Sequence, residues 1–135
     1  MEVREIEASD VEAVQRLLFE NGWTDERVTG LEQFRALLSK SQRALVAVHE
    51  GKVIGFARAI CDELSNGYVS MLVVAEPQRR KGVGRALVNA VIGGNNRISW
   101  MLRASDPEVA PFYEKLGFVR STAAMERPRA KRSDT

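Results

Sequence analysis

Residues 71–85 decide the fold; they read Met71-Leu-Val-Val-Ala-Glu-Pro-Gln-Arg-Arg-Lys-Gly-Val-Gly-Arg85. The apolar run at 71–74 predicts a strand. Beyond this stretch, apolar residues recur at helical spacing over 86–92, which predicts a helix that begins near Gly82. A strand that enters a glycine turn and continues as a helix is typical of a small α/β protein.

The turn between this strand and helix has the composition of an anion site. The first turn of a helix holds backbone N–H groups without intrahelical partners, and the helix dipole places partial positive charge there. Glycines let an anion approach that backbone closely. Four cationic side chains add full charge: Arg79, Arg80, Lys81 and Arg85. We interpret 77–85 as a pyrophosphate site, with a solvated basic turn that caps a helix as the alternative.

Two common phosphate-binding motifs are excluded. A dinucleotide fingerprint would need glycine where Leu87 stands, and the chain contains no Gly-Lys-Ser/Thr tripeptide. The spacing that fits is Arg/Gln-x-x-Gly-x-Gly/Ala, formed here by Arg79, Gly82 and Gly84. This pattern resembles the acetyl-CoA-binding motif of the GNAT superfamily of N-acetyltransferases.

Length, composition and charge narrow the class further. The chain has 135 residues, 44% apolar and 28% charged, which suits one domain with one core. A net charge of +2 does not require a nucleic-acid partner, and Cys61 is the single cysteine, so no internal disulfide can form. The charged start lacks a signal-peptide core, and no apolar run reaches the ~20 residues of a membrane helix. We therefore expect a cytoplasmic protein without a membrane partner.

The rest of the chain predicts a mixed sheet with helices on its faces. Ser9 and Glu12 fit a capping box at the start of the first helix, and Ser65-Asn66-Gly67 is a turn signal. The predicted strands are 3–7, 43–49, 53–61, 68–74, 97–103 and 118–125, and the predicted helices are 11–20, 31–38, 82–92 and 106–116.

This order of elements is also that of the GNAT fold, an α/β class with a central, mostly antiparallel sheet flanked by helices. We expect a single domain over 1–127 and a flexible polar tail over 128–135.

A second motif lies at 110–118, Ala-Pro-Phe-Tyr-Glu-Lys-Leu-Gly-Phe. We expect Gly117 to end a helix in a left-handed cap, with Phe118 folding back onto that helix. The segment resembles the late GNAT segment that ends Phe-Tyr-x-Lys-x-Gly-Phe. In that family the tyrosine often protonates the departing thiolate, so the resemblance assigns Tyr113 as general acid. A buried core tyrosine is the alternative.

The resemblance implies transfer of the acetyl group of acetyl-CoA to a primary amine by direct attack in a ternary complex, without a metal. It places the pantetheine arm along the strand at 72–74, where the N–H of Leu72 or Val73 would polarise the acetyl carbonyl. The backbone N–H groups of 80–85 would hold the pyrophosphate. The candidate cosubstrate-binding residues are Leu72, Val73, Val74, Arg79, Arg80, Lys81, Gly82, Val83, Gly84 and Arg85.

The chain departs from the family pattern at two places. Asp106 stands where many relatives have an asparagine that contacts the cofactor, and a helix-capping role fits an anion there better. The strand at 68–75 lacks the carboxylate that often serves as base. A base acting through water could be Asp62, Glu63 or Glu20, and a surface role is the alternative for each. His49 is interpreted as a surface residue.

Alternatives stay open for activity and partners. A non-catalytic acyl-CoA-binding module would keep the cosubstrate site without turnover. A nucleic-acid binder would use Arg79-Arg80-Lys81 and the tail, but the chain lacks stacking-aromatic, zinc-ligand and helix-turn-helix patterns. The acceptor, a small molecule or a peptide amine, is not specified by the sequence. The sequence also does not specify whether the acceptor side is open or is completed by a second copy of the chain in a homodimer.

Overall fold

The computed structural model describes residues 1–130 as parts of two compact units, Met1–Arg103 and Ala104–Thr135. The first unit is built on a five-stranded sheet in the order β1-β2-β3-β4-β5. Neighbouring strands are antiparallel except for the parallel pair β4 and β5. The mixed, mostly antiparallel sheet is therefore confirmed. Its strands are β1 Glu2–Glu5, β2 Arg43–His49, β3 Lys52–Cys61, β4 Asn66–Val74 and β5 Ser99–Leu102.

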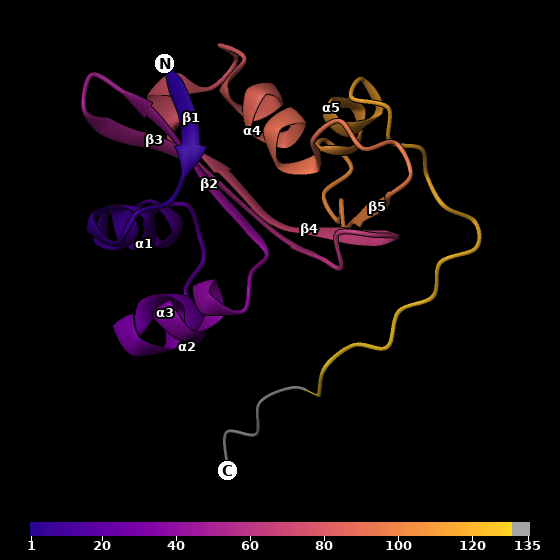
Figure 1. Ribbon diagram of the computed structural model, residues 1–135, viewed down its shortest axis with the longest axis horizontal. Helices are drawn as coiled ribbons and strands as arrows, with labels where there is room; N and C mark the ends of the chain where they lie inside the picture. The colour runs from indigo at the N-terminus through magenta and orange to yellow at the C-terminus, as the bar shows by residue number, and fades with distance from the viewer. Residues whose placement is uncertain (131–135) are drawn as a thin grey trace. The chain divides into compact units, whose positions relative to one another are not determined.

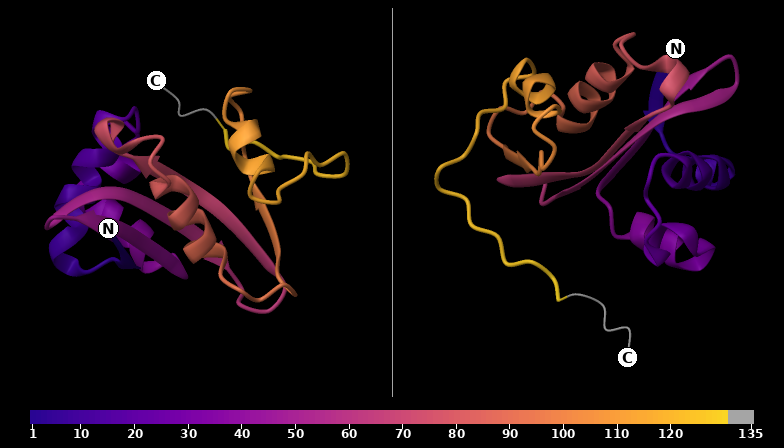
Figure 2. Two further views of the ribbon diagram at one scale, coloured as in Figure 1. Left: turned by 90° about the horizontal axis from the view of Figure 1, so that it is seen from above. Right: turned by 180° about the vertical axis from the view of Figure 1, so that it is seen from behind.

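Helices cover both faces of this sheet (Figures 1 and 2). The helices α1 (Val11–Glu20), α2 (Glu26–Thr29) and α3 (Leu31–Ser39) lie on one face, and α4 (Val83–Ile92) lies on the other. The predictions of α1, α3 and α4 are confirmed to within a residue or two. The sequence did not indicate α2, because four residues are too short to show helical periodicity.

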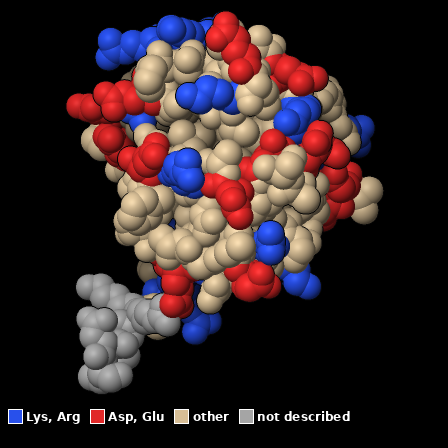
Figure 3. All heavy atoms as spheres, turned by 90° about the vertical axis from the view of Figure 1, so that its left-hand side faces the viewer, with Lys and Arg blue, Asp and Glu red and all other residues tan. Residues whose placement is uncertain are grey.

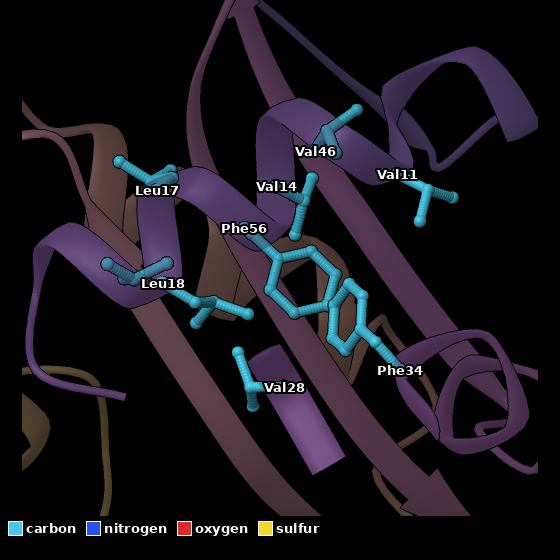
Figure 4. Packing of buried hydrophobic residues seen from close by; sticks show 9 residues of the cluster. Val11, Val14, Leu17, Leu18, Val28, Phe34, Val46 and Phe56 are labelled. Carbon is cyan, nitrogen blue, oxygen red and sulfur yellow. The ribbon is translucent and has the colours of Figure 1, made fainter. Parts of the chain in front are cut away.

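The core under α1–α3 is built from the alternation of side chains along the strands. Val46, Phe56 and Val73 are register partners on adjacent strands and point to the same face. The ring of Phe34 meets that of Phe56 edge-on, with 6.3 Å between centroids (Figure 4). This cluster fixes the three N-terminal helices on the sheet. The remaining members are Val11, Val14, Leu17, Leu18 and Val28.

Small residues on the opposite face bring α4 close to the sheet. Ala57 and Ala59 face α4 and are fully buried. A Cβ atom at Gly55 would lie 2.7 Å from Leu87 Cδ1 and 3.2 Å from Val83 Cγ1, so glycine is needed for this approach. The first turn of α4 is therefore set directly against β3, which positions the loop that precedes it.

Two local predictions were wrong, although the elements that they served are present. The capping box is formed by Glu7 and Asp10 around a short 3-10 helix (Ala8–Asp10), rather than by Ser9 and Glu12. The turn before β4 is organised by Asp62, whose carboxylate accepts hydrogen bonds from three successive backbone N–H groups, those of residues 64–66. The Asn66-Gly67 pair already belongs to β4.

The second unit contains the short helix α5 (Ala110–Glu114), half the length that we expected. Its cap is as predicted: Gly117 has a φ of 95°, and the N–H of Phe118 donates to the carbonyl of Tyr113. The centroid of the Phe118 ring lies 5.8 Å from that of Tyr113. The single-domain assignment over 1–127 stays a prediction.

The predicted strand at 118–125 is wrong. Residues 118–130 form no helix or strand, and Val119 and Met125 are 87% and 96% exposed. The hydroxyl of Ser121 instead accepts hydrogen bonds from the N–H groups of Ala123 and Ala124, which closes a local turn. Of the predicted tail, 128–130 are exposed and irregular, and 131–135 lie outside the described residues.

Asp10 joins β1 to the start of α1 and should give the fold an acid-sensitive contact. Its carboxylate accepts hydrogen bonds from the Arg4 guanidinium at 2.7 and 3.1 Å and from the Glu7 N–H at 2.7 Å. The bonds from Arg4 are the largest cause of a pKa below the usual aspartate value. This stabilisation is complete above about pH 4 and is lost as the pH falls through the folded-state pKa.

We expect Asp10→Asn to lower the free energy of unfolding by about 2 kcal/mol at pH 7 and to flatten its decline below pH 4. Urea unfolding from pH 7 to pH 2.5 measures both effects, with exposed Glu12→Gln as the control. A variant that loses stability on acidification as steeply as the wild type would contradict this assignment.

Candidate functional site

The loop between β4 and α4 presents backbone N–H groups in succession. It follows a 3-10 helix (Glu76–Gln78), and Arg80 and Gly82 adopt left-handed conformations with φ of 66° and 85°. Within residues 1–130, no acceptor receives a hydrogen bond from the N–H groups of 80–85, and the first bond of α4 is donated by Ala86. Alternating left- and right-handed residues at a helix start form a concave anion-binding nest.

Of the four cationic side chains of this loop, one forms hydrogen bonds within the protein and three are exposed. Arg79 Nε donates to the carbonyl of Val74 at 3.1 Å, and its Nη2 donates to the side-chain oxygen of Asn21. Arg79 therefore ties the loop to the end of β4 and to the C-terminus of α1. The side chains of Arg80, Lys81 and Arg85 are exposed and form no ion pair with any described carboxylate.

The strand before the loop loses its partner on one side. β4 pairs with β5 only over 66–69, and the pairing of β4 with β3 is interrupted by a bulge at Ser70. The side of 70–74 that faces away from β3, here called the open edge, has no strand partner among the described residues.

Strand alternation determines which N–H groups face the open edge. Ala75 N–H donates to the carbonyl of Ile54 in β3, so Val73 also faces β3, while Leu72 and Val74 face away from it. Leu72 and Val74 can therefore hydrogen-bond an extended ligand, and of the two carbonyl-polarising candidates Leu72 is favoured over Val73.

One charged residue near the open edge was overlooked in the sequence. Arg58 lies on β3 and is only 6% exposed. Its Nε donates to Ser41 Oγ at 2.7 Å, and its Nη1 donates to Ser70 Oγ, at the bulge, at 2.6 Å. A signal was present, because an arginine flanked by alanines interrupts an otherwise apolar strand.

In the second unit, Tyr113 is a buried residue that keeps its proton. Its ring contacts those of Phe112 and Phe118 edge-on, with centroids at 5.0 and 5.8 Å. Burial raises the pKa of the phenol, so the hydroxyl is protonated at neutral pH and can donate. Asp106 accepts a hydrogen bond from the Glu108 N–H at 2.9 Å, which closes a local turn before α5. The predicted helix-capping role of Asp106 is wrong, because the N-cap of α5 is Val109.

Two of the three candidate bases are held as anions by their neighbours. The Ser65 hydroxyl, followed by the N–H groups of 64–66, keeps the pKa of Asp62 far below its usual value. A hydrogen bond from the Arg43 guanidinium lowers the pKa of Glu63, and Arg43 Nη2 lies 3.0 Å from Glu63 Oε2. A carboxylate with a depressed pKa is a poor proton acceptor. Glu20 is exposed at the end of α1, and His49 is exposed as predicted.

Within residues 1–130, no three His, Cys, Asp or Glu side chains are grouped to hold a metal ion. None of the helices in that range has the length and apolarity that a membrane crossing requires. On the face drawn in Figure 3, acidic and basic side chains are interspersed rather than gathered into a basic patch. That face therefore lacks the electrostatic footprint of a nucleic-acid interface.

The open edge and the N–H groups at 80–85 lie on a mixed α/β sheet whose class the comparisons identify. Residues 40–120, more than half of the chain, match the family described as acetyltransferase (GNAT) domain, and the chain belongs to this family. It is 29% identical over 90 residues to the N-alpha-acetyltransferase MAK3 of Arabidopsis thaliana, covering 59% of this chain and 46% of that relative. The chain spans less than half the length, 46% and 41%, of the curated relatives it matches.

Solved structures agree with this family. Ard1 from Thermoplasma volcanium superposes with a TM-score of 0.72 at 25% identity, covering 89% of this chain and 83% of that one. A GNAT family acetyltransferase from Streptococcus pneumoniae gives a TM-score of 0.76 at 24% identity over 96% and 97% of the two chains, which shows the shared fold.

The conformation of the loop depends on the backbone of Gly82. A side chain at this position could oppose it by steric contact or by disfavouring the left-handed φ, and these two effects can be separated. A Cβ atom at Gly82 would meet nothing within 4 Å, so only the left-handed φ opposes substitution. We expect Gly82→Val to lower the free energy of unfolding by about 1–2 kcal/mol and to weaken binding of inorganic pyrophosphate. Gly82→Asn is the matched control, because asparagine tolerates this conformation.

Chemical unfolding and calorimetric titration with pyrophosphate measure these effects. Equal losses in the two variants would show that the conformation of residue 82 is not what matters.

Proposed function

We propose that this chain is an acetyl-CoA-dependent N-acetyltransferase that moves the acetyl group to a primary amine by direct attack in a ternary complex. The observation that carries the proposal is the continuity of two unpaired backbone surfaces. The open edge of β4 leads through Arg79 directly into the N–H nest at 80–85. An extended arm that ends in a pyrophosphate matches this order of donors.

The residues present fit coenzyme A by their chemistry. The six successive N–H groups of 80–85 can donate hydrogen bonds to phosphate oxygens, and the side chains of Arg80, Lys81 and Arg85 supply positive charge. The N–H groups of Leu72 and Val74 can pair with the amides of the pantetheine arm. We assign the N–H of Leu72 to the carbonyl that becomes the oxyanion.

The acceptor must lose a proton before it can attack. An amine of lysine type has a pKa near 10.4, so roughly one molecule in 2,500 is a free nucleophile at neutral pH. Because Asp62 and Glu63 are held as anions, water or Glu20 is left to take the proton. Similarity to an N-alpha-acetyltransferase favours the α-amine of a peptide as acceptor.

We also propose that the protein works in the reducing cytoplasm. The free, buried thiol of Cys61 is consistent with this location.

The thiolate that leaves must gain a proton, and we assign its donor as Tyr113. The phenol is neutral at the pH of the reaction because burial raises its pKa. Its ring is held by Phe112 and Phe118, which fixes the direction of the hydroxyl. A phenylalanine would keep this packing and remove only the proton donor.

We expect Tyr113→Phe to lower turnover by ~10² or more, the scale of lost acid catalysis, with little change in acetyl-CoA affinity. The measurement is thiol release from acetyl-CoA with a panel of peptide and small-molecule amines, together with calorimetric titration of the cosubstrate. Gly84→Glu is the contrasting variant, since a carboxylate in the nest should abolish cosubstrate binding itself.

An unchanged rate in Tyr113→Phe would remove this residue from the mechanism. Tight binding of acetyl-CoA without amine-dependent thiol release would identify the second candidate, a non-catalytic acyl-CoA-binding module. The absence of a carboxylate from 68–75 is the observation that favours this alternative.

A further inference from the structure

Arg58 is a buried charge whose partners do not neutralise it. Asp10 and Arg58 are the two charged side chains that are buried within residues 1–130, 7% and 6% exposed. Asp10 is paired with Arg4. Arg58 instead makes hydrogen bonds to two neutral hydroxyls, those of Ser41 and Ser70, and forms no ion pair with a described carboxylate. Burying a charge without a counter-ion is costly, so this arrangement calls for a reason.

The two serines aim the guanidinium while leaving part of it available. The Ser41 hydroxyl donates to the Leu37 carbonyl at 2.8 Å, so its oxygen is turned to accept from Arg58 Nε. Arg58 Nη2 has no hydrogen-bond partner among the described residues, yet it is not one of the side-chain atoms sealed from solvent. Part of this end of the fork is therefore open to solvent, although Arg58 as a whole is only 6% exposed.

The surroundings of Arg58 leave its positive charge without a nearby counter-ion. Burial disfavours the charged form of Arg58 and is the largest cause of a lowered guanidinium pKa. Tyr68 partly offsets this effect, and Arg27 on α2 adds to it. Arg27 is itself held by Asp25, with Arg27 Nε 2.7 Å from Asp25 Oδ1. An arginine stays protonated under these conditions, which leaves one positive charge uncompensated.

Arg58 lies close in the sheet to Leu72, the residue that we assign to the acetyl carbonyl. Ser70, which binds Arg58 Nη1, forms the bulge at the start of the open edge, two residues before Leu72. Arg58 lies on the face of β3 that Phe56 shares, the face covered by α1–α3, while α4 covers the other face. On the same face, Ile60 and Met101 flank Tyr68 in cross-strand register and are 44% and 51% exposed.

We propose that Arg58 binds a carboxylate of the acceptor, so that the substrate class is an amine that also carries a carboxylate and a small apolar part. The guanidinium fork matches the two oxygens of a carboxylate, and the exposed apolar row accommodates the aliphatic part. Diamines and polyamines are excluded, because their second cation would meet an uncompensated positive charge. This inference rests on the proposed transferase function.

The wild-type protein tests the inference with acceptor pairs in which a carboxylate is replaced by a neutral amide. One arm compares free α-amino acids with their α-amides, and the other compares peptides that begin Met-Glu with peptides that begin Met-Gln. In at least one arm we expect kcat/KM to favour the carboxylate by about 10- to 100-fold, mainly through KM. The arm that shows the preference identifies the source of the carboxylate, and equal values in both arms overturn the inference.

Variants assign the preference to Arg58. Arg58→Gln should abolish the discrimination between acid and amide, and Arg58→Lys should keep part of it as a point charge without the fork. Arg35→Gln, an exposed cation on α3 that is 53% exposed, is the matched control and should keep it in full. Discrimination that survives Arg58→Gln overturns the inference even where turnover falls.

A binding measurement separates this inference from the proposed function. Thermal stabilisation by N-acetyl amino acids, compared with their amides, requires no turnover. Thiol release without discrimination refutes only the role of Arg58. A complete lack of amine-dependent thiol release with a carboxylate preference in binding refutes the transferase and leaves the carboxylate site.

Discussion

Strand β4 has hydrogen-bonding partners on both sides only as far as Val69, and the rest of the site depends on this limit. The bulge at Ser70 adds an unpaired residue to β4, and a bulge bends a strand and increases its twist. Beyond it, β4 is still held by β3 but no longer by β5. Backbone donors that an intact sheet would satisfy are therefore left unpaired along β4, and strand alternation alone determines which of them face away from β3.

The position of the nest depends on packing on the face of the sheet that α4 covers. Because Gly55 lacks a side chain, Leu87 and Val83 lie directly on β3, and the first turn of α4 is fixed relative to the sheet. Arg79 then joins the loop to Val74 at the end of β4 and to Asn21 at the end of α1. A rigid backbone nest binds an anion better than flexible lysines would, since its donors are ordered before the ligand arrives.

The sequence predicted the parts whose signals are local. The alternation of 43–61 and the glycine-rich turn at 82–84 each contain their own evidence, and the hairpin and α4 were confirmed, while the pyrophosphate site in the turn stays a prediction. The strand at 118–125 was wrong, because short alternating stretches resemble strands whether or not a partner exists to pair with them. Arg58 was missed because its significance lies in what it fails to contact, and only three-dimensional burial reveals a missing counter-ion.

The two anion sites that we propose, which differ in construction, lie at the two ends of the open edge. At the Val74 end, many weak backbone dipoles suit the diffuse charge of a diphosphate; at the Ser70 end, one guanidinium suits a single carboxylate. If both are filled, the protein must hold two anionic substrates near one strand despite their mutual repulsion. An uncompensated cation lowers that cost, and it does so most where burial weakens the screening by water. The buried charge of Arg58 is then a requirement of a ternary complex, rather than a defect of the core.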